Sequence, residues 1–180
     1  MKKRTLIILV ALVAVFGMAV GGTIAWLTDQ TEPITNTFTV GNINIELKET
    51  ATDFKMVPGV TIAKDPKITV KSGSEACYLF VKVEKSTNLN DFITYTMAAG
   101  WIALTSVDGV YYREVDATAS DTTFSVLADD QVTCKDTVTK VMMDALTEDT
   151  YPTLTFTAYA VQQLGSDSAA EAWAKVTATP

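Results

Sequence analysis

Apolar and polar residues alternate along most of the chain after residue 36, which is the pattern of half-buried β-strands. The clearest case is the segment 76–85. Its apolar face consists of Cys77, Leu79, Val81 and Val83, and its opposite face of Tyr78, Phe80, Lys82 and Glu84. Further strands are predicted at 37–47, 60–63, 67–70, 92–98, 101–104, 109–115, 122–127, 131–134, near 138–143 and at 153–164. Short strands separated by turn signals favour an antiparallel sandwich or barrel over βαβ units.

The alternation changes phase at Gly41. Phe38 and Val40 are even-numbered, whereas Ile43, Ile45 and Leu47 are odd-numbered. A slip of one residue would turn one of these sets toward solvent. We therefore predict a bulge or hinge at Gly41, because glycine accepts the backbone angles that a bulge requires.

Two stretches break the strand pattern. Ser168 and Glu171 have the spacing of a capping box, which predicts a short helix with Trp173 packed on the sheet. The segments 86–91 and 116–123 are polar and are expected to be exposed loops.

The first 27 residues have the order of a secretory leader. Lys2, Lys3 and Arg4 precede an uncharged apolar run, and small residues follow from Gly21 to Ala25. This order predicts a signal peptide over residues 1–25, cleaved after Ala25. The alternative is an uncleaved anchor over residues 6–27, which is long enough to span roughly 30 Å of hydrocarbon. Both alternatives place the rest of the chain outside the cell.

The charge of the chain argues against nucleic acid as a partner. The formal net charge is −7, and removal of the three basic residues at the head leaves 11 basic and 21 acidic residues, a charge of −10. Such a domain repels phosphate backbones.

Catalytic chemistry finds little support in the residue types. The chain has no histidine, which removes histidine-based triads and histidine-ligated zinc. The acidic pairs Asp129–Asp130 and Glu148–Asp149 lie in polar stretches and are expected to be solvated. We predict no catalytic residues, no metal site and no cofactor.

Two further groups of residues leave alternatives open. Cys77 and Cys134 could form a disulfide or remain two core thiols, while a reactive thiolate would need a basic neighbour and exposure. Six aromatic residues could line a carbohydrate-binding face, although at strand spacing core packing is more frequent. They are Tyr78, Phe80, Trp101, Tyr111, Tyr112 and Tyr159.

The junction between leader and first strand, "GGTIAWLTDQTEPITNTFTVGNINIEL", resembles that of the TasA and camelysin-type proteins secreted by Gram-positive bacteria. The matching positions are Gly21, Gly22, Thr23, Asp29, Asn36, Thr37, Phe38 and Gly41. "KDPKITVKSGSEACYLFVKV" and "AYAVQQLGSDSAAEAW" are similar to later parts of that family. The segment from about 86 to 135 matches it only loosely.

The resemblance implies export through a dedicated signal peptidase of the W type, with cleavage near Ala25, Trp26 and Leu27. It also implies a jelly-roll β-sandwich and a structural role in biofilm-matrix fibres or on the cell or spore surface. In fibre-forming members, the first strand of the mature chain completes the sheet of a neighbouring subunit. The matching donor strand here is Asn36, Thr37, Phe38, Thr39 and Val40.

A physical argument supports such a donor strand independently. A strand that alternates threonine with apolar residues can pair through its backbone with an open sheet edge. Threonine favours the extended state and tolerates water, so the segment stays soluble until it docks. Repetition of such a contact from head to tail gives a filament.

These observations combine into one prediction. Residues 1–25 form a leader, with cleavage after residue 26 as the alternative; 26–41 form an extended segment; and 42–180 form an all-β jelly-roll-like antiparallel sandwich with a short C-terminal helix. The expected function is that of a secreted, non-enzymatic fibre subunit or accessory component whose partners are its own copies or homologous subunits. Membrane contact is expected only through the leader before cleavage. The alternatives are a monomeric or anchored surface domain that binds a ligand or glycan and, last, a camelysin-like protease.

Overall fold

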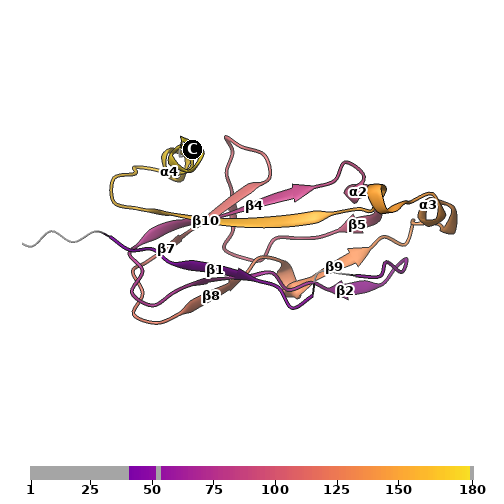
Figure 1. The fold of residues 1–180 in the computed structure, drawn as a ribbon, viewed down its shortest axis with the longest axis horizontal. Helices are drawn as coiled ribbons and strands as arrows, with labels where there is room; N and C mark the ends of the chain where they lie inside the picture. Colours follow the sequence, from indigo (N-terminus) through magenta and orange to yellow (C-terminus); the bar gives the residue numbers. More distant parts are fainter. Residues whose placement is uncertain (1–40, 52–53, 179–180) are drawn as a thin grey trace, which may run out of the picture. The chain divides into compact units, whose positions relative to one another are not determined.

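The computed structural model describes residues 41–51 and 54–178, which form two layers of antiparallel strands with a helix on the outer face of one layer (Figure 1). The predicted antiparallel β-sandwich with a short C-terminal helix is therefore confirmed.

The first layer is a four-stranded sheet in the order β10-β4-β7-β6. Its strands are β10 (Leu154–Gln162), β4 (Cys77–Lys85), β7 (Val110–Val115) and β6 (Ile102–Ala103). All three pairings are antiparallel, and β10 pairs with β4 over nine residues. The two central strands are β4 and β7, so β10 and β6 form the edges of this layer.

The second layer consists of two three-stranded sheets, β1-β3-β8 and β2-β9-β5. Their strands are β1 (Ile45–Lys48), β3 (Lys67–Val70), β8 (Thr122–Ser125), β2 (Thr61–Ala63), β9 (Gln131–Cys134) and β5 (Ile93–Thr94). Backbone hydrogen bonds join the two sheets end to end: Val126 N donates to Pro66 O over 2.9 Å, and Lys64 N donates to Asp130 O over 2.8 Å. The chain from β2 to β3 thus pairs continuously with the chain from β8 to β9.

Strand β4 is buried on both faces. Leu79, Val81 and Val83 point into the core between the two layers, where they pack with Ile68 and Val70 of β3. Tyr78 and Phe80 point to the opposite side, beneath the C-terminal helix. The predicted division of this strand into two faces is confirmed.

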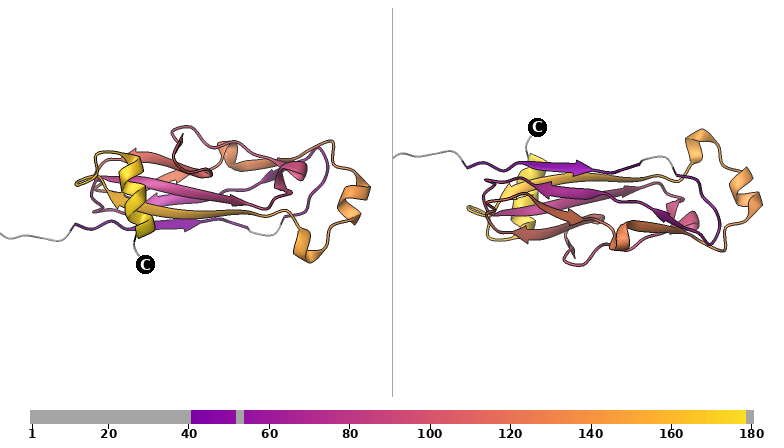
Figure 2. Two further views of the ribbon diagram at one scale, coloured as in Figure 1. Left: turned by 90° about the horizontal axis from the view of Figure 1, so that it is seen from above. Right: turned by 90° about the horizontal axis from the view of Figure 1, so that it is seen from below.

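Helix α4 (Ala169–Ala178) covers the outer face of the first layer. Ser168 Oγ accepts from Glu171 N over 3.2 Å, so the predicted cap is present, while the Glu171 carboxylate accepts from Asp167 N instead of Ser168 N. The Trp173 ring lies 5.2 Å from that of Phe80 and 5.3 Å from that of Tyr159. The predicted packing of Trp173 on the sheet is confirmed, and Figure 2 shows α4 lying across the strands of this layer.

Three sequence predictions of local structure were wrong in whole or in part. The segment near 138–143 contains helix α3 (Lys140–Asp144), whose first turn is capped by Thr139 Oγ1 accepting from Met142 N over 3.3 Å. The expected loop 86–91 contains the start of helix α2 (Leu89–Phe92), which buries Leu89 in the core. Only Ile93 and Thr94 of the predicted strand 92–98 form a regular strand, with an isolated bridge from Met97 to Leu127.

We predict that Trp173→Ala lowers the free energy of unfolding by about 3–4 kcal/mol, because the substitution leaves a large cavity between α4 and the sheet. Ala174→Ser, on the exposed side of the same helix, is the matched control and should change it by less than about 0.5 kcal/mol. Urea denaturation followed by circular dichroism measures both. Equal effects of the two substitutions would show that α4 does not stabilise the sheet.

Candidate functional site

The outer edge of β10 has no strand partner among the described residues. On its inner edge, β10 pairs with β4 from Leu154 opposite Lys85 to Gln162 opposite Cys77. Its apolar side chains Leu154, Phe156, Ala158 and Ala160 pack against the core between the layers. Edge strands of this length are templates for pairing with another chain.

Strand β1 runs beside β10 but pairs with β3 (Figures 1 and 2). The pairing continues toward the N-terminus, since Asn44 O accepts from Lys71 N and Asn42 O accepts from Glu75 N, each over 2.9 Å. Ile43, Ile45 and Leu47 pack against the core, as the alternation after Gly41 predicts. The residues that follow Gly41 therefore belong to the chain's own sheet.

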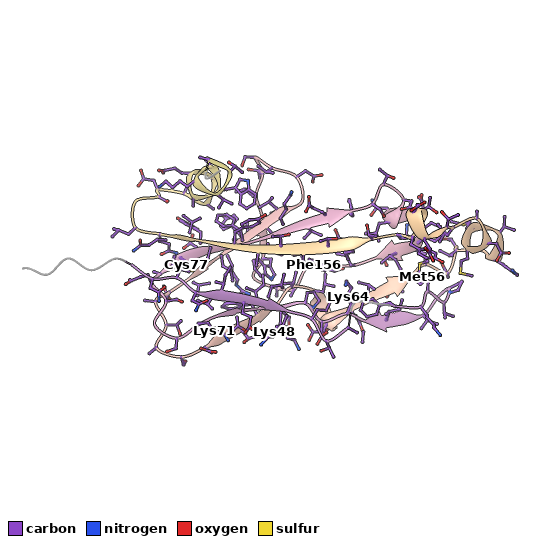
Figure 3. All side chains as sticks on the ribbon, in the orientation of Figure 1. Lys48, Met56, Lys64, Lys71, Cys77 and Phe156 are labelled. Atoms are coloured by element: carbon purple, nitrogen blue, oxygen red, sulfur yellow. The ribbon has the colours of Figure 1, made fainter. Side chains whose placement is uncertain are left out.

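A cavity of about 1030 Å³ opens beside the first residues of β10. Most of its lining is apolar, and it includes Leu47, Phe54, Met56, Ile62, Leu89, Ile93, Val132, Met143, Leu146, Leu154 and Phe156. Met56 and Phe156 are labelled in Figure 3. We call the outer edge of β10, Leu154–Gln162, together with this cavity the β10 seam. An apolar side chain that entered the cavity would be removed from contact with water.

A largely buried ion pair forms one wall of the cavity. Lys64 Nζ lies 2.7 Å from Glu49 Oε1, and the side chains are only 9% and 16% exposed. The ammonium group also lies 4.9 Å from the centre of the Phe54 ring and 5.5 Å from that of Phe156. The carboxylate and the two rings offset the free energy that the Lys64 ammonium loses with its hydration shell. They also hold the Lys64 side chain in place at this wall of the cavity.

Gly41 marks where the chain enters the described domain. A β-carbon at this position would lie 3.1 Å from the Gln162 side chain, so the chain passes close to the C-terminal end of β10. The predicted cleavage residues Ala25, Trp26 and Leu27 lie outside the described residues. So does the predicted donor strand, Asn36, Thr37, Phe38, Thr39 and Val40. The bulge at Gly41 depends on these residues and stays a prediction.

The disulfide between Cys77 and Cys134 is not present, and both thiols are free and buried. Cys77 begins β4, which extends over roughly 26 Å, while Cys134 packs with Leu89 and Phe92 beyond the other end of that strand. A disulfide needs α-carbons within about 7 Å, so this fold keeps the cysteines apart. Burial raises the pKa of Cys77 to about 11 and also raises that of Cys134, which disfavours the reactive thiolate.

The aromatic residues do not form a carbohydrate-binding face. Tyr78 and Phe80 are buried beneath α4, and Tyr112 and Tyr159 pack against the same cluster. Trp101 is buried between the layers, where its Nε1 donates to Ser125 O over 2.9 Å, and Tyr111 packs against that core. The alternative of one binding face formed by all six rings was wrong, because α4 covers Tyr78 and Phe80 and the two layers enclose Trp101.

One of the two acidic pairs is structural. Asp130 lies 3.2 Å from Lys67 Nζ, and its Oδ1 is buried without a hydrogen-bond partner in the described structure. Asp129 and Asp130 have left-handed φ angles of 54° and 52°, which turn the chain between β8 and β9. Glu148 and Asp149 are exposed, as expected. Asp129 is exposed as expected, whereas Asp130 is only partly solvated because its ion pair with Lys67 connects this turn to β3.

The described part of the chain holds no group of three or more His, Cys, Asp or Glu side chains that could share a metal ion. Within residues 41–51 and 54–178, no helix is long and apolar enough to cross a bilayer. Comparisons of the chain with protein-family models, with curated proteins and with solved structures find no match.

Sequence reasoning missed the cavity because its walls come from segments that are far apart in the chain, from Leu47 to Phe156. The available signal was the apolar pair Phe54 and Met56 in a segment without strand alternation. Side chains of this kind in a loop indicate packing against something else in the fold.

We predict that Glu49→Gln lowers the free energy of unfolding by about 2–3 kcal/mol, because it leaves the Lys64 ammonium without its counter-ion. The double variant Lys64→Met/Glu49→Leu should recover most of this loss. Asp144→Asn is the control, since its pair with Lys140 is 61% and 82% exposed and should contribute less than about 0.5 kcal/mol. An equal loss for Glu49→Gln and Asp144→Asn in urea denaturation would contradict the structural role of the buried pair.

We also predict that the native protein resists thiol reagents at pH 8. Because burial raises the pKa of Cys77 from 9.0 to about 11, the thiolate fraction falls about a hundredfold at this pH. Ellman's reagent should react slowly with the native protein, faster as the pH rises toward 11, and rapidly with two thiols after unfolding. A native mass about two daltons lower than the reduced mass would instead demonstrate a disulfide.

Proposed function

We propose that this protein is a secreted, non-enzymatic subunit of extracellular matrix fibres, in which residues 36–40 of one copy complete the sandwich of the next. The observation that carries this proposal is the outer edge of β10, which no strand of the described residues pairs with. The resemblance of the leader junction to TasA and camelysin-type proteins supports it from the sequence.

The strand order supports a jelly roll with one place open to a neighbour. Counting β2–β3 and β8–β9 as single strands gives eight, with layers ordered 8-3-6-5 and 1-2-7-4. A jelly roll has the orders 1-8-3-6 and 2-7-4-5, so the inner strands 8-3-6 and 2-7-4 agree. Its first strand pairs with the last, whereas β1 here pairs with β3. The place beside β10 is the one that a donated strand would take.

The donor segment has the composition that this place requires. Backbone groups would pair with β10, as in β-strand addition. Phe38 and Val40 share one face of an extended strand and would turn toward the apolar β10 seam, while Thr37 and Thr39 would face water. Asp29 and Glu32 precede this strand, and charges of this kind limit uncontrolled edge pairing.

The position of Gly41 favours donation of residues 36–40 from each copy of the protein to the next copy in a filament. Gly41, the first described residue, lies beside Gln162 at one end of β10, while the cavity lies at the other end, beside Leu154. The donor segment and the acceptor edge are different surfaces, so the contact is heterologous. Contacts of this type extend into filaments when they do not close into a ring.

Export is part of the same proposal. A dedicated signal peptidase would remove residues 1–25, with cleavage after Trp26 as the alternative, and leave the donor segment at the free N-terminus. The mature protein would then lie in the extracellular matrix or at the cell surface. The N-terminal sequence of the secreted protein measures the cleavage position directly, and an intact leader would instead indicate anchoring.

We predict that Phe38→Asp abolishes filaments of the mature protein, because a carboxylate would have to enter the apolar seam. Thr39→Asp introduces the same charge on the opposite face of the strand and is the matched control, which should still assemble. Deletion of residues 27–40 should leave a folded monomer. Negative-stain electron microscopy and sedimentation report assembly, and circular dichroism reports folding.

Three results would contradict this assignment. They are a wild-type protein that remains monomeric at all concentrations, filaments that survive the deletion, and equal effects of Phe38→Asp and Thr39→Asp. The last result would show that the charge of the segment, and not its apolar face, controls assembly.

A further inference from the structure

A second cleft lies where β4 continues beyond β7. Val110, the first residue of β7, pairs with Lys82, so the last residues of β4 extend past the end of that neighbour. The cleft has a volume of about 460 Å³, within the usual range of about 300–1000 Å³ for small-ligand sites. Its lining is Lys85, Asn90, Ile93, Thr94, Tyr95, Thr96, Met97, Tyr111 and Lys135.

The charge of this cleft is opposite to that of the chain. None of its lining residues is acidic, although the chain has 21 acidic and 14 basic residues. Seven of the eleven basic residues in the described structure form ion pairs, but Lys85 and Lys135 have no carboxylate within 4.0 Å there. Two ammonium groups therefore face the cleft without a counter-ion from the described structure.

Both lysines are held at the cleft by the fold. The backbone of Lys85 is fixed by the pairing of β4 with Leu154. Lys135 N donates to Phe92 O over 2.8 Å, and the Lys135 ammonium donates to Asn90 O. The fold thus fixes the backbone of Lys85 and both the backbone and the ammonium group of Lys135, which lowers the entropy lost when they bind an anion.

The remaining lining offers hydroxyl groups and aromatic rings. Thr94 and Thr96 are exposed, and Tyr95 and Tyr111 are half-buried. Burial, followed by the proximity of Tyr111 and Asp108, raises the pKa of Tyr95, so its phenol stays protonated and able to donate. Asp108 is the nearby negative charge, and it lies outside the lining.

From this arrangement we infer that the cleft binds a uronic-acid residue of an acidic polysaccharide. The sugar carboxylate binds between Lys85 and Lys135, the tyrosine rings contact the face of the sugar, and the threonine and asparagine groups bond its hydroxyls. The combination of hydroxyl donors, aromatic rings and two lysines favours a saccharide over an acidic peptide, which needs the charges alone. This site shares only Ile93 with the lining of the β10 seam and does not depend on the proposed assembly.

The test is isothermal titration calorimetry of the mature protein with trimers of galacturonate, glucuronate and mannuronate. Each trimer is compared with its methyl ester, which keeps the ring and removes the charge. At least one acid trimer should bind, and its affinity should exceed that of its ester at least tenfold. Lys85→Gln/Lys135→Gln should weaken binding at least tenfold and leave the melting temperature and the filaments unchanged.

The matched control is Lys82→Gln/Lys140→Gln, which removes the same charge from two lysines that are already ion-paired. It should change the affinity less than twofold. No binding of any acid trimer, or an equal loss in the control, would overturn the inference. Equal affinity for a glutamate trimer with the same dependence on Lys85 and Lys135 would overturn the saccharide assignment in favour of an acidic peptide.

Discussion

Burial of β4 on both faces and hydrogen bonding on both of its edges determine the arrangement of the rest of the domain. Leu79 and Val81 are fully buried against the second layer, and Phe80 is fully buried beneath α4. Strands β10 and β7 occupy its two edges. A strand with no exposed side needs apolar residues at every central position, and Leu79, Phe80 and Val81 meet this requirement.

The same arrangement separates the two surfaces for which we propose functions. Because β10 covers one edge of β4 along all nine residues, the outer edge of β10 is the accessible boundary on that side. On the other side β7 covers only part of β4, which leaves room for the lysine-lined cleft. The proposed assembly surface and the proposed saccharide cleft therefore adjoin different edges of β4, the first across β10 and the second beyond the end of β7.

The sequence predicted most of the elements that place one apolar face against the core and the other toward water. Alternation identified most strands, and Ser168 and Glu171 located α4. The period-two pattern of β4 predicted its two faces, but it could not show whether the second face meets water or a helix. Tyr78 and Tyr159 were therefore left with two interpretations, a binding face or core packing, and both in fact pack in one cluster with Trp173.

Helices of only four or five residues could not be predicted from the periodicity of apolar residues. Helices α2 and α3 are too short to show a helical repeat, although Thr139 as a cap and the pair Lys140–Asp144 were local signals for α3. The β10 seam combines distant segments, and its apolar wall depends on the Lys64–Glu49 pair, which no local pattern reveals. Sheet order also decides which edge stays open, and a single sequence does not contain that order.

The late position of β10 in the chain has a consequence for folding. Residues 154–162 are translated about 110 residues after Gly41, on the order of ten seconds at ordinary rates of synthesis. Until they arrive, the edge of β4 that pairs with β10 is itself uncovered, although Leu79, Phe80 and Val81 of this strand are fully buried in the finished domain. An incomplete chain therefore exposes an unpaired edge of β4, which the finished domain covers with β10. Chaperone binding to the nascent chain is most needed in that interval, before β10 pairs with β4 and covers this edge.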